Sequence, residues 1–218
     1  MVFYSTRLTH VVFMPAERSS GARDTLSLDA GTVGRGAIFG AIAYAVGYLS
    51  AFPIASGKVG ESVPEFVPAW KAAWWFFYNS HFTDITLSAS GVISGTDTVS
   101  FVSNSTDPVV QLLYLVPPVV LVVVGALLAR NAGLTDDTTE AAKAGALVVV
   151  SYLPLAVVGV FLTTHSGTSS VSAGLIDASV SAEYSIQLVP AFLLTGLLYP
   201  LVFGAIGGGA ASALEDRR

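Results

Sequence analysis

Three side chains in this sequence have the chemistry of a metal site, and they are His81, Asp84 and His165. Imidazole and carboxylate groups together suit zinc, and Asp84 follows His81 by three residues. Local hydrogen bonding is the alternative role for the two histidines, and it needs no metal. We predict neither a metal nor a cofactor, and we keep these three residues as the candidates for metal binding.

Catalytic motifs that operate inside membranes are missing from the sequence. Intramembrane proteolysis needs a serine–histidine pair, two aspartates or a His-Glu-x-x-His helix at membrane depth. The absence of cysteine excludes thiolate nucleophiles and thiolate metal ligands. We therefore assign no catalytic residue and expect a protein that is not an enzyme.

Four long stretches contain no Asp, Glu, Lys or Arg. They run from Arg35 to Lys58, from Asp107 to Arg130, from Lys143 to His165 and from Glu183 to Glu215. A helix of about 20 apolar residues crosses about 30 Å of hydrocarbon. The pattern predicts four transmembrane helices, at about residues 33–55, 108–129, 138–164 and 187–214.

The overall composition agrees with a membrane protein. Of the 218 residues, 53% are hydrophobic and only 11% are charged. The formal net charge of −5 argues against a nucleic-acid partner, which would need a basic face. The lipid bilayer is the predicted environment, and partner membrane proteins or further copies of the chain are the predicted contacts.

The basic residues predict how the chain is threaded. Lys58 and Lys71 fall in the loop at residues 56–107. The other eight of the ten lie before or at the start of span one, between spans two and three or near the start of span three, or after span four. The positive-inside rule then places both termini in the cytoplasm of a multi-pass cell-membrane protein. Residues 1–32 are predicted to be a disordered cytoplasmic tail, and residues 215–218 a short one.

The outer loop at residues 56–107 begins with an aromatic segment from Pro64 to Phe82. Several of its aromatic residues recur at helical spacing, and Trp and Tyr favour the headgroup level. The segment predicts an amphipathic helix that lies on the outer membrane surface. A platform that binds sugar or lipid is the alternative. The predicted membrane-interface residues are Trp70, Trp74, Trp75, Phe77 and Tyr78.

The rest of the outer side is predicted to be a small cap. Residues 83–104 alternate apolar and polar side chains between tight-turn signals, which indicates two or three short strands. The loop at residues 165–184 is rich in Ser and Gly and is expected to be irregular. Asn104-Ser105-Thr106 is an acceptor pattern for N-glycosylation. The complete fold class is thus an all-α membrane protein with an interfacial aromatic helix and a hairpin-like β cap.

Small residues and prolines mark the predicted spans. Gly36 and Gly40, and likewise Ala43 and Gly47, are four residues apart, which allows another helix backbone to approach closely. Prolines in spans two, three and four are expected to kink those helices. The kink positions are Pro117, Pro118, Pro154, Pro190 and Pro200.

Several apolar motifs resemble those of a known family. The motifs are Pro68-Ala69-Trp70-Lys71, Trp74-Trp75-Phe76-Phe77-Tyr78-Asn79, His81-Phe82, Leu113-Tyr114-Leu115-Val116-Pro117-Pro118 and Tyr152-Leu153-Pro154-Leu155-Ala156. From span one to span four the chain resembles a family of haloarchaeal membrane proteins that has no assigned activity. The resemblance implies the same host class and a four-span plan, and it carries over no catalytic residues.

The leading hypothesis is a non-enzymatic component of the cell membrane that acts through packing against partner proteins or lipids. Small-residue helix faces and an aromatic outer segment motivate it. The alternative is a small transporter or channel for a neutral or apolar solute. That alternative predicts a cavity lined by Tyr44, Tyr114, Tyr152 or Tyr199.

Overall fold

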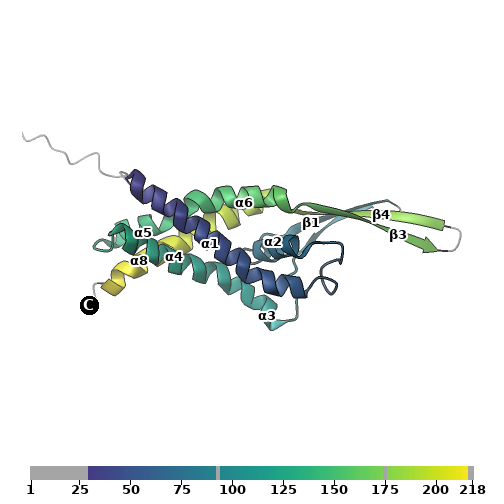
Figure 1. Ribbon diagram of the computed structural model, residues 1–218, viewed down its shortest axis with the longest axis horizontal. Helices are drawn as coiled ribbons and strands as arrows, with labels where there is room; N and C mark the ends of the chain where they lie inside the picture. The colour runs from purple at the N-terminus through teal and green to yellow at the C-terminus, as the bar shows by residue number, and fades with distance from the viewer. Residues whose placement is uncertain (1–28, 92–93, 174–175, 216–218) are drawn as a thin grey trace, which may run out of the picture.

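The protein is a long helical bundle with a β-sheet projecting from one end (Figure 1). The structure, a computed structural model, describes residues 29–91, 94–173 and 176–215. Most of the predicted N-terminal tail, residues 1–28, lies outside the described residues, as do residues 216–218 of the C-terminal tail. We call the end of the bundle from which the sheet projects the sheet end, and the opposite end, where α1 begins and α8 ends, the terminal end.

Four helical segments are long and apolar enough to cross a membrane, as the sequence predicts. The first span is one helix, and each of the others consists of two or three consecutive segments. The segments are α1 (Ala30–Gly57); α3 (Pro108–Gln111), the 3₁₀ turn η1 (Leu112–Leu115) and α4 (Val116–Ala132); α5 (Thr138–Ala146) and α6 (Val149–Thr163); α7 (Leu188–Pro190), the π-helix η2 (Ala191–Leu198) and α8 (Tyr199–Glu215).

An aspartate is the N-cap residue of the first helix in three of the four spans. Asp29 caps α1, Asp107 caps α3 and Asp137 caps α5. At α5 the Asp137 carboxylate accepts from the backbone N–H groups of Thr139 (2.7 Å) and Glu140 (3.1 Å). These N–H donors favour the ionised form and hold the pKa of Asp137 below its ordinary value, the bond from Glu140 most of all.

Prolines coincide with changes of helix type in the second and fourth spans. Pro117 is the second residue of α4, which directly follows the 3₁₀ turn η1. Pro200 is the second residue of α8, which directly follows the π-helix η2, and the Tyr199 N–H donates to the Leu194 carbonyl five residues back. Because proline has no N–H, the preceding turn must change its hydrogen-bond pattern. The predicted kinks themselves stay a prediction, and at Pro154 the α6 helix continues without a change of helix type.

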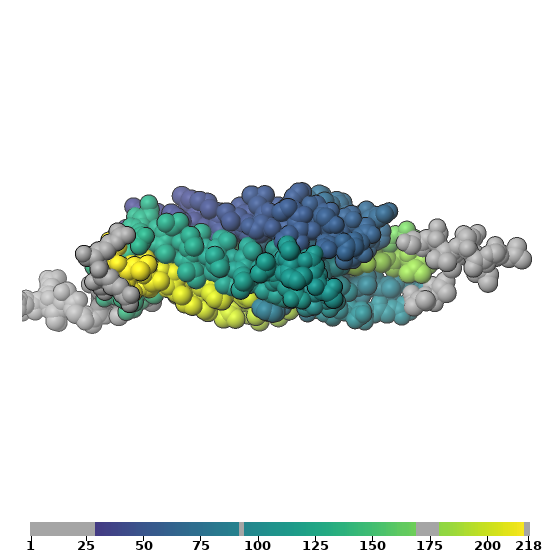
Figure 2. Space-filling view, turned by 90° about the horizontal axis from the view of Figure 1, so that it is seen from below, coloured from purple at the N-terminus to yellow at the C-terminus, as the bar shows by residue number. Residues whose placement is uncertain are grey.

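At the terminal end the helices approach one another through glycine. A Cβ atom on Gly208 of α8 would overlap the carbonyl oxygen of Ala141 in α5, and one on Gly207 would overlap that of Val122 in α4. The backbones of α4, α5 and α8 therefore meet with no side chain between them. Figure 2 shows α1, α4 and α8 lying along one face of this elongated bundle.

The sheet is antiparallel and has four strands in the order β2-β1-β4-β3. Strands β1 (Ile85–Gly91) and β2 (Gly95–Val99) lie in the region where the sequence predicts short strands. Strands β3 (His165–Ala173) and β4 (Ile176–Ile186) replace the irregular loop that we predicted, so that prediction was wrong. Ser and Ala do not favour strands by themselves, and pairing between long partners overrides their low propensity.

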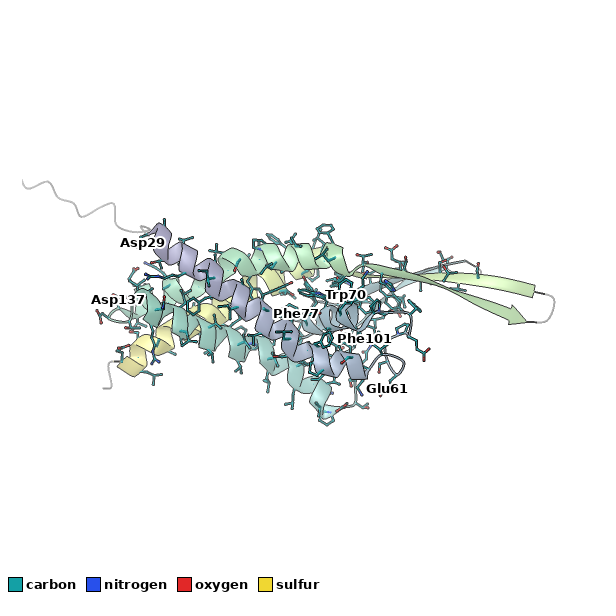
Figure 3. All side chains as sticks on the ribbon, in the orientation of Figure 1. Asp29, Glu61, Trp70, Phe77, Phe101 and Asp137 are labelled. Atoms are coloured by element: carbon teal, nitrogen blue, oxygen red, sulfur yellow. The ribbon has the colours of Figure 1, made fainter. Side chains whose placement is uncertain are left out.

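The remaining helix, α2 (Ala69–Asn79), lies among the spans at the sheet end. Its residues form the centre of the hydrophobic core together with residues of α1, α6 and the sheet. Figure 3 shows Phe77 of α2 within the bundle and Phe101 toward the sheet end, whereas Asp29 and Asp137 lie at the terminal end.

Candidate functional site

Helix α2 enters the bundle from the sheet end and runs down the side of α6. Three side chains of α2, and His81 just beyond its end, bond to progressively earlier residues of the third span. The contacts in order are Lys71 Nζ to the Thr164 carbonyl (2.6 Å), Trp75 Nε1 to the Thr163 carbonyl (3.2 Å), the Tyr78 hydroxyl to the Ala156 carbonyl, and His81 Nε2 with the Tyr152 hydroxyl (2.9 Å). From Thr164 to Tyr152 the helix axis advances about 18 Å, so the tip of α2 lies near the middle of the third span.

Two of these bonds also complete the hydrogen bonding of α6. The last carbonyls of a helix have no partner within the helix. Trp75 and Lys71 supply donors to the carbonyls of Thr163 and Thr164, where α6 ends and β3 begins. The α2 helix is thus bound to the third span through the polar backbone as well as through apolar packing.

The prediction that α2 lies on the membrane surface was wrong for most of its aromatic residues. Trp75, Phe77 and Tyr78 are buried inside the protein, Trp74 is half-buried, and Trp70 is 44% exposed. Helical spacing of aromatic residues shows that one side of a helix is apolar, but it does not distinguish lipid headgroups from a groove between other helices.

Glycines on the neighbouring spans create the space that α2 occupies. A Cβ atom on Gly47 of α1 would lie 2.7 Å from the Phe77 ring. A Cβ atom on Gly159 of α6 would overlap the Tyr78 hydroxyl. These two glycines lie where α2 passes between α1 and α6, and they explain why large rings fit there.

His81, just beyond the end of α2, is buried and carries a defined hydrogen-bond pattern. Its Nδ1 lies 2.8 Å from the Phe77 carbonyl, which can only accept, so Nδ1 carries the proton. Nε2 therefore accepts from the Tyr152 hydroxyl. Burial disfavours the charged ring and lowers the pKa of His81 below its ordinary value. The ring is held as the neutral Nδ1–H tautomer between Phe77 and Tyr199, whose ring centroids lie 4.7 and 4.8 Å away.

The polar groups around the α2 tip connect the spans to the sheet. Asn79 donates to the Thr83 carbonyl (2.9 Å) and accepts from the Phe101 N–H (2.8 Å). The Thr83 hydroxyl bonds to that of Thr195 (3.0 Å), which belongs to the π-helix η2. All four of these residues are buried. A π segment commonly marks a functional position in a helix, and here it receives the hydroxyl contact from Thr83.

The centre of the bundle beside His81 is filled by tyrosine rings. The Tyr44 hydroxyl bonds to that of Tyr78 (3.0 Å) and donates to the Leu155 carbonyl (3.0 Å). The ring of Tyr44 meets that of Tyr152 edge-on, with centroids 4.9 Å apart. Tyr44 and Tyr152 are both buried, so the middle of the bundle at this level is packed.

The structure does not bring the three metal candidates together. His81 lies at the α2 tip, whereas His165 lies at the start of β3, with its Nε2 3.0 Å from the Phe66 carbonyl. The Asp84 backbone carbonyl accepts from the Gln187 N–H at the base of the sheet. Among residues 29–91, 94–173 and 176–215, no group of three His, Cys, Asp or Glu residues could hold a metal ion. Both histidines instead hydrogen-bond to other groups of the protein.

In the part of the chain that the structure describes, two of the surface hollows lie away from the buried tyrosines. One has a volume of about 430 Å³ and lies between the loop at residues 60–65 and the sheet, where Glu61, Glu65 and Tyr184 line it. The other has a volume of about 440 Å³ and is an apolar groove between Phe161 of α6 and Phe192 of η2. Neither is lined by any of the four tyrosines that the transporter hypothesis names, Tyr44, Tyr114, Tyr152 or Tyr199.

The sequence analysis missed the polar cluster at the α2 tip, although one signal was present. From Ala72 to Thr83 the chain carries no Asp, Glu, Lys or Arg, and His81 falls inside this stretch. The stretch is too short to span a bilayer, which is why it was assigned to the surface. A short uncharged aromatic segment with polar residues at its end is also what a re-entrant helix requires.

The described residues form four helical segments long and apolar enough to cross a membrane, a short helix inserted among them and one antiparallel sheet, which is consistent with a multi-pass membrane protein. The protein belongs to the family of unknown function DUF7978, whose sequence profile matches residues 15–215. Comparison with curated proteins and with solved structures gives no match.

Proposed function

We propose that this protein is a non-enzymatic component of a haloarchaeal cell membrane that holds its β-sheet outside the cell for interaction with another protein. Both termini then lie in the cytoplasm. The distribution of basic residues supports this orientation, because basic residues favour the cytoplasmic side. Arg35 and Arg130 lie together at the terminal end, where Arg35 bonds to the carbonyl of Asn131, the neighbour of Arg130. The two lysines at the sheet end contact groups of the protein itself, Lys58 pairing with Asp107 (3.3 Å) and Lys71 binding a carbonyl.

The observation that carries the proposal is the direct continuation of the spans into the β3–β4 hairpin. Only Thr164 separates α6 from β3, and only Gln187 separates β4 from α7. The hairpin is therefore held by the third and fourth spans without a flexible linker. A sheet mounted in this way keeps a fixed orientation relative to the bundle.

The hairpin also extends beyond the rest of the sheet. Strand β1 pairs with β4 only as far as Val180, whereas residues 176–179 of β4 pair with β3 alone. Figure 1 shows this two-stranded part projecting farthest from the bundle. A strand edge offers backbone donors and acceptors to an additional extended chain. The projecting hairpin is therefore the part of the protein best placed to meet a partner.

Shortening the hairpin tests the proposal. The variant joins Thr168 to Ser181, which are paired in the sheet, through an Asn-Gly turn. It keeps every residue of the spans. The control variant replaces Asp136, in the exposed connection between α4 and α5, by Ser. We expect the shortened protein to keep its melting temperature and to lose the protein cross-links formed in native membranes, whereas the control keeps both. An unchanged cross-linking pattern in the shortened variant would refute the proposal.

A second function, a small transporter or channel for a neutral solute, gains support from one observation. The re-entrant tip places His81 and Thr83 beside the π-helix of the fourth span, where a local change of helix type could open a path. Reconstitution into vesicles followed by an osmotic swelling assay with neutral solutes tests it. Swelling that is faster than in empty vesicles and is slowed by Thr195→Val would favour this function over the first one.

A further inference from the structure

We propose that Asn104 is N-glycosylated by a membrane-bound transferase that uses a lipid-linked oligosaccharide. This modification goes beyond the proposed function and rests only on the outward orientation of the sheet end. The sequence Asn104-Ser105-Thr106 supplies the amide and the hydroxyl that the acceptor pattern requires.

The side chain of Asn104 is available in the folded protein. Asn104 is exposed in the turn between β2 and α3. Its Oδ1 accepts a long bond from the Ser103 hydroxyl (3.5 Å), and no bond in the described part of the chain uses its Nδ2. The other two asparagines differ. Asn79 is buried with both its amide atoms bonded, and Asn131 is followed by Ala-Gly, which lacks the hydroxyl.

The surrounding turn does not depend on the atoms that would be modified. The Gln111 side chain donates to the Ser105 carbonyl (2.9 Å), and the Ser105 hydroxyl accepts from the Asp107 N–H (3.1 Å). The side chains of Asn104 and Thr106 take no part in these bonds, and Thr106 is exposed. A glycan on Nδ2 would therefore leave the hydrogen bonds that define the turn in place.

Charged neighbours place Asn104 on the water side of the membrane boundary. Lys58, at the end of α1, pairs with Glu61 (3.2 Å) and with Asp107 at the start of the second span (3.3 Å). Three charged groups at one level favour the headgroups or water over hydrocarbon. Asn104 precedes Asp107 by three residues, on the side away from the span.

The chemistry needs a glycosyl donor in which the sugar is linked through its anomeric carbon to a lipid phosphate. The Nδ2 atom of Asn104 forms a bond to that carbon while the bond from the carbon to the phosphate oxygen breaks. The lipid phosphate leaves with the bonding electrons, and Nδ2 loses one proton to a base of the transferase. One N–H is thereby replaced by an N–C bond, and no oxidation or reduction takes place.

The experiment compares full-length proteins purified from cells whose own secreted glycoproteins carry N-glycans. The variants are Asn104→Gln and Thr106→Ala, which remove the acceptor pattern, and Thr106→Ser, which keeps it. A further variant, Ser94→Asn, creates Asn-Gly-Thr at the exposed start of β2. Intact mass and peptide mass spectrometry measure glycan occupancy at each site.

We expect glycan on Asn104 in the natural protein and in Thr106→Ser, and complete loss of it in Asn104→Gln and Thr106→Ala. An unmodified Asn104 in a Ser94→Asn protein that carries glycan on the new site would overturn the proposal and leave the outward orientation standing. If neither site carries glycan, both the modification and the outward orientation of the sheet end are refuted.

Discussion

At the terminal end of the bundle α4, α5 and α8 meet through glycine, whereas at the sheet end α1 and α6 are separated by the aromatic side chains of α2. Gly207 and Gly208 of α8 leave no room for a Cβ atom. At the other end Trp75 packs against Phe101 with ring centroids 5.8 Å apart and against Tyr184 at 5.1 Å. The same four spans are therefore held together by close backbone approach in one half and by inserted rings in the other.

The difference shows two solutions to one problem. Lipid tails are as apolar as leucine, so helices in a membrane gain little from burying apolar area and depend on packing and hydrogen bonds instead. Glycine lets backbones reach van der Waals contact directly. Where the spans diverge toward the sheet, the space is filled by α2, which also brings the polar tip with His81 into the bundle. The polar chemistry of the interior is therefore concentrated in the half packed by aromatic residues.

Removing the central ring of the aromatic half is expected to give the largest effect. Trp75 is fully buried and donates to the Thr163 carbonyl. We expect Trp75→Ala to lower the free energy of unfolding by about 3–5 kcal/mol, because it leaves a cavity and an orphan carbonyl. Trp70→Ala, at a position that is 44% exposed, is the matched control and is expected to cost less than about 1 kcal/mol. Thermal unfolding in detergent measures both, and equal losses would contradict the buried position of α2.

Adding a single methyl group to the glycine half is expected to have the next largest effect. A Cβ atom on Gly208 would overlap the backbone of Ala141, whereas one on Gly34 of α1 has nothing within 4 Å. We expect Gly208→Ala to cost about 1–3 kcal/mol through overpacking. We expect Gly34→Ala to stabilise the helix by roughly 0.5–1 kcal/mol. Melting temperatures that fall for Gly34→Ala or stay constant for Gly208→Ala would show that the terminal half is not packed backbone to backbone.

The features that can be predicted from the sequence are those that depend on local composition. Charge-free runs of about 20 residues predict the four spans because the bilayer thickness sets their length. The glycine spacing in α1 predicts close approach, and Gly36 and Gly40 do face the backbone near Leu147 and Val148.

The features that could not be predicted depend on which surface an amphipathic segment contacts. The aromatic side of α2 suits a membrane surface and a protein groove equally well, and only the glycines of two distant spans decide between them. The bond between His81 and Tyr152 joins residues 71 positions apart and has no local signature. Strands β3 and β4 form from a Ser-rich segment because they pair with each other and with β1.

Removing the hydroxyl of Tyr152 tests the polar tip of the aromatic half. Without that hydroxyl, Nε2 of His81 loses its donor inside a buried site. We expect Tyr152→Phe to cost about 1–3 kcal/mol, since an unsatisfied buried acceptor retains its desolvation penalty. Tyr48→Phe is the control, because the Tyr48 hydroxyl makes only an exposed 3.4 Å bond to the Trp70 carbonyl. Equal melting temperatures for the two variants would mean that the bond between His81 and Tyr152 does not stabilise the fold.

Acidification tests the same tip with a smaller expected effect. Burial lowers the pKa of His81 in the folded protein, so below the ordinary value of about 6.5 the unfolded chain takes up a proton that the folded protein does not. The stability that depends on neutral His81 is therefore complete above that value and is lost as the pH falls, by at most about 1.4 kcal/mol per pH unit. We expect melting temperatures measured from pH 7.5 to 5 to fall more steeply for the natural protein than for His81→Phe. All other titrating groups are common to both proteins, so parallel curves would show that His81 is protonated as readily in the fold as in the unfolded chain, and the aromatic half would not exclude water from its polar tip.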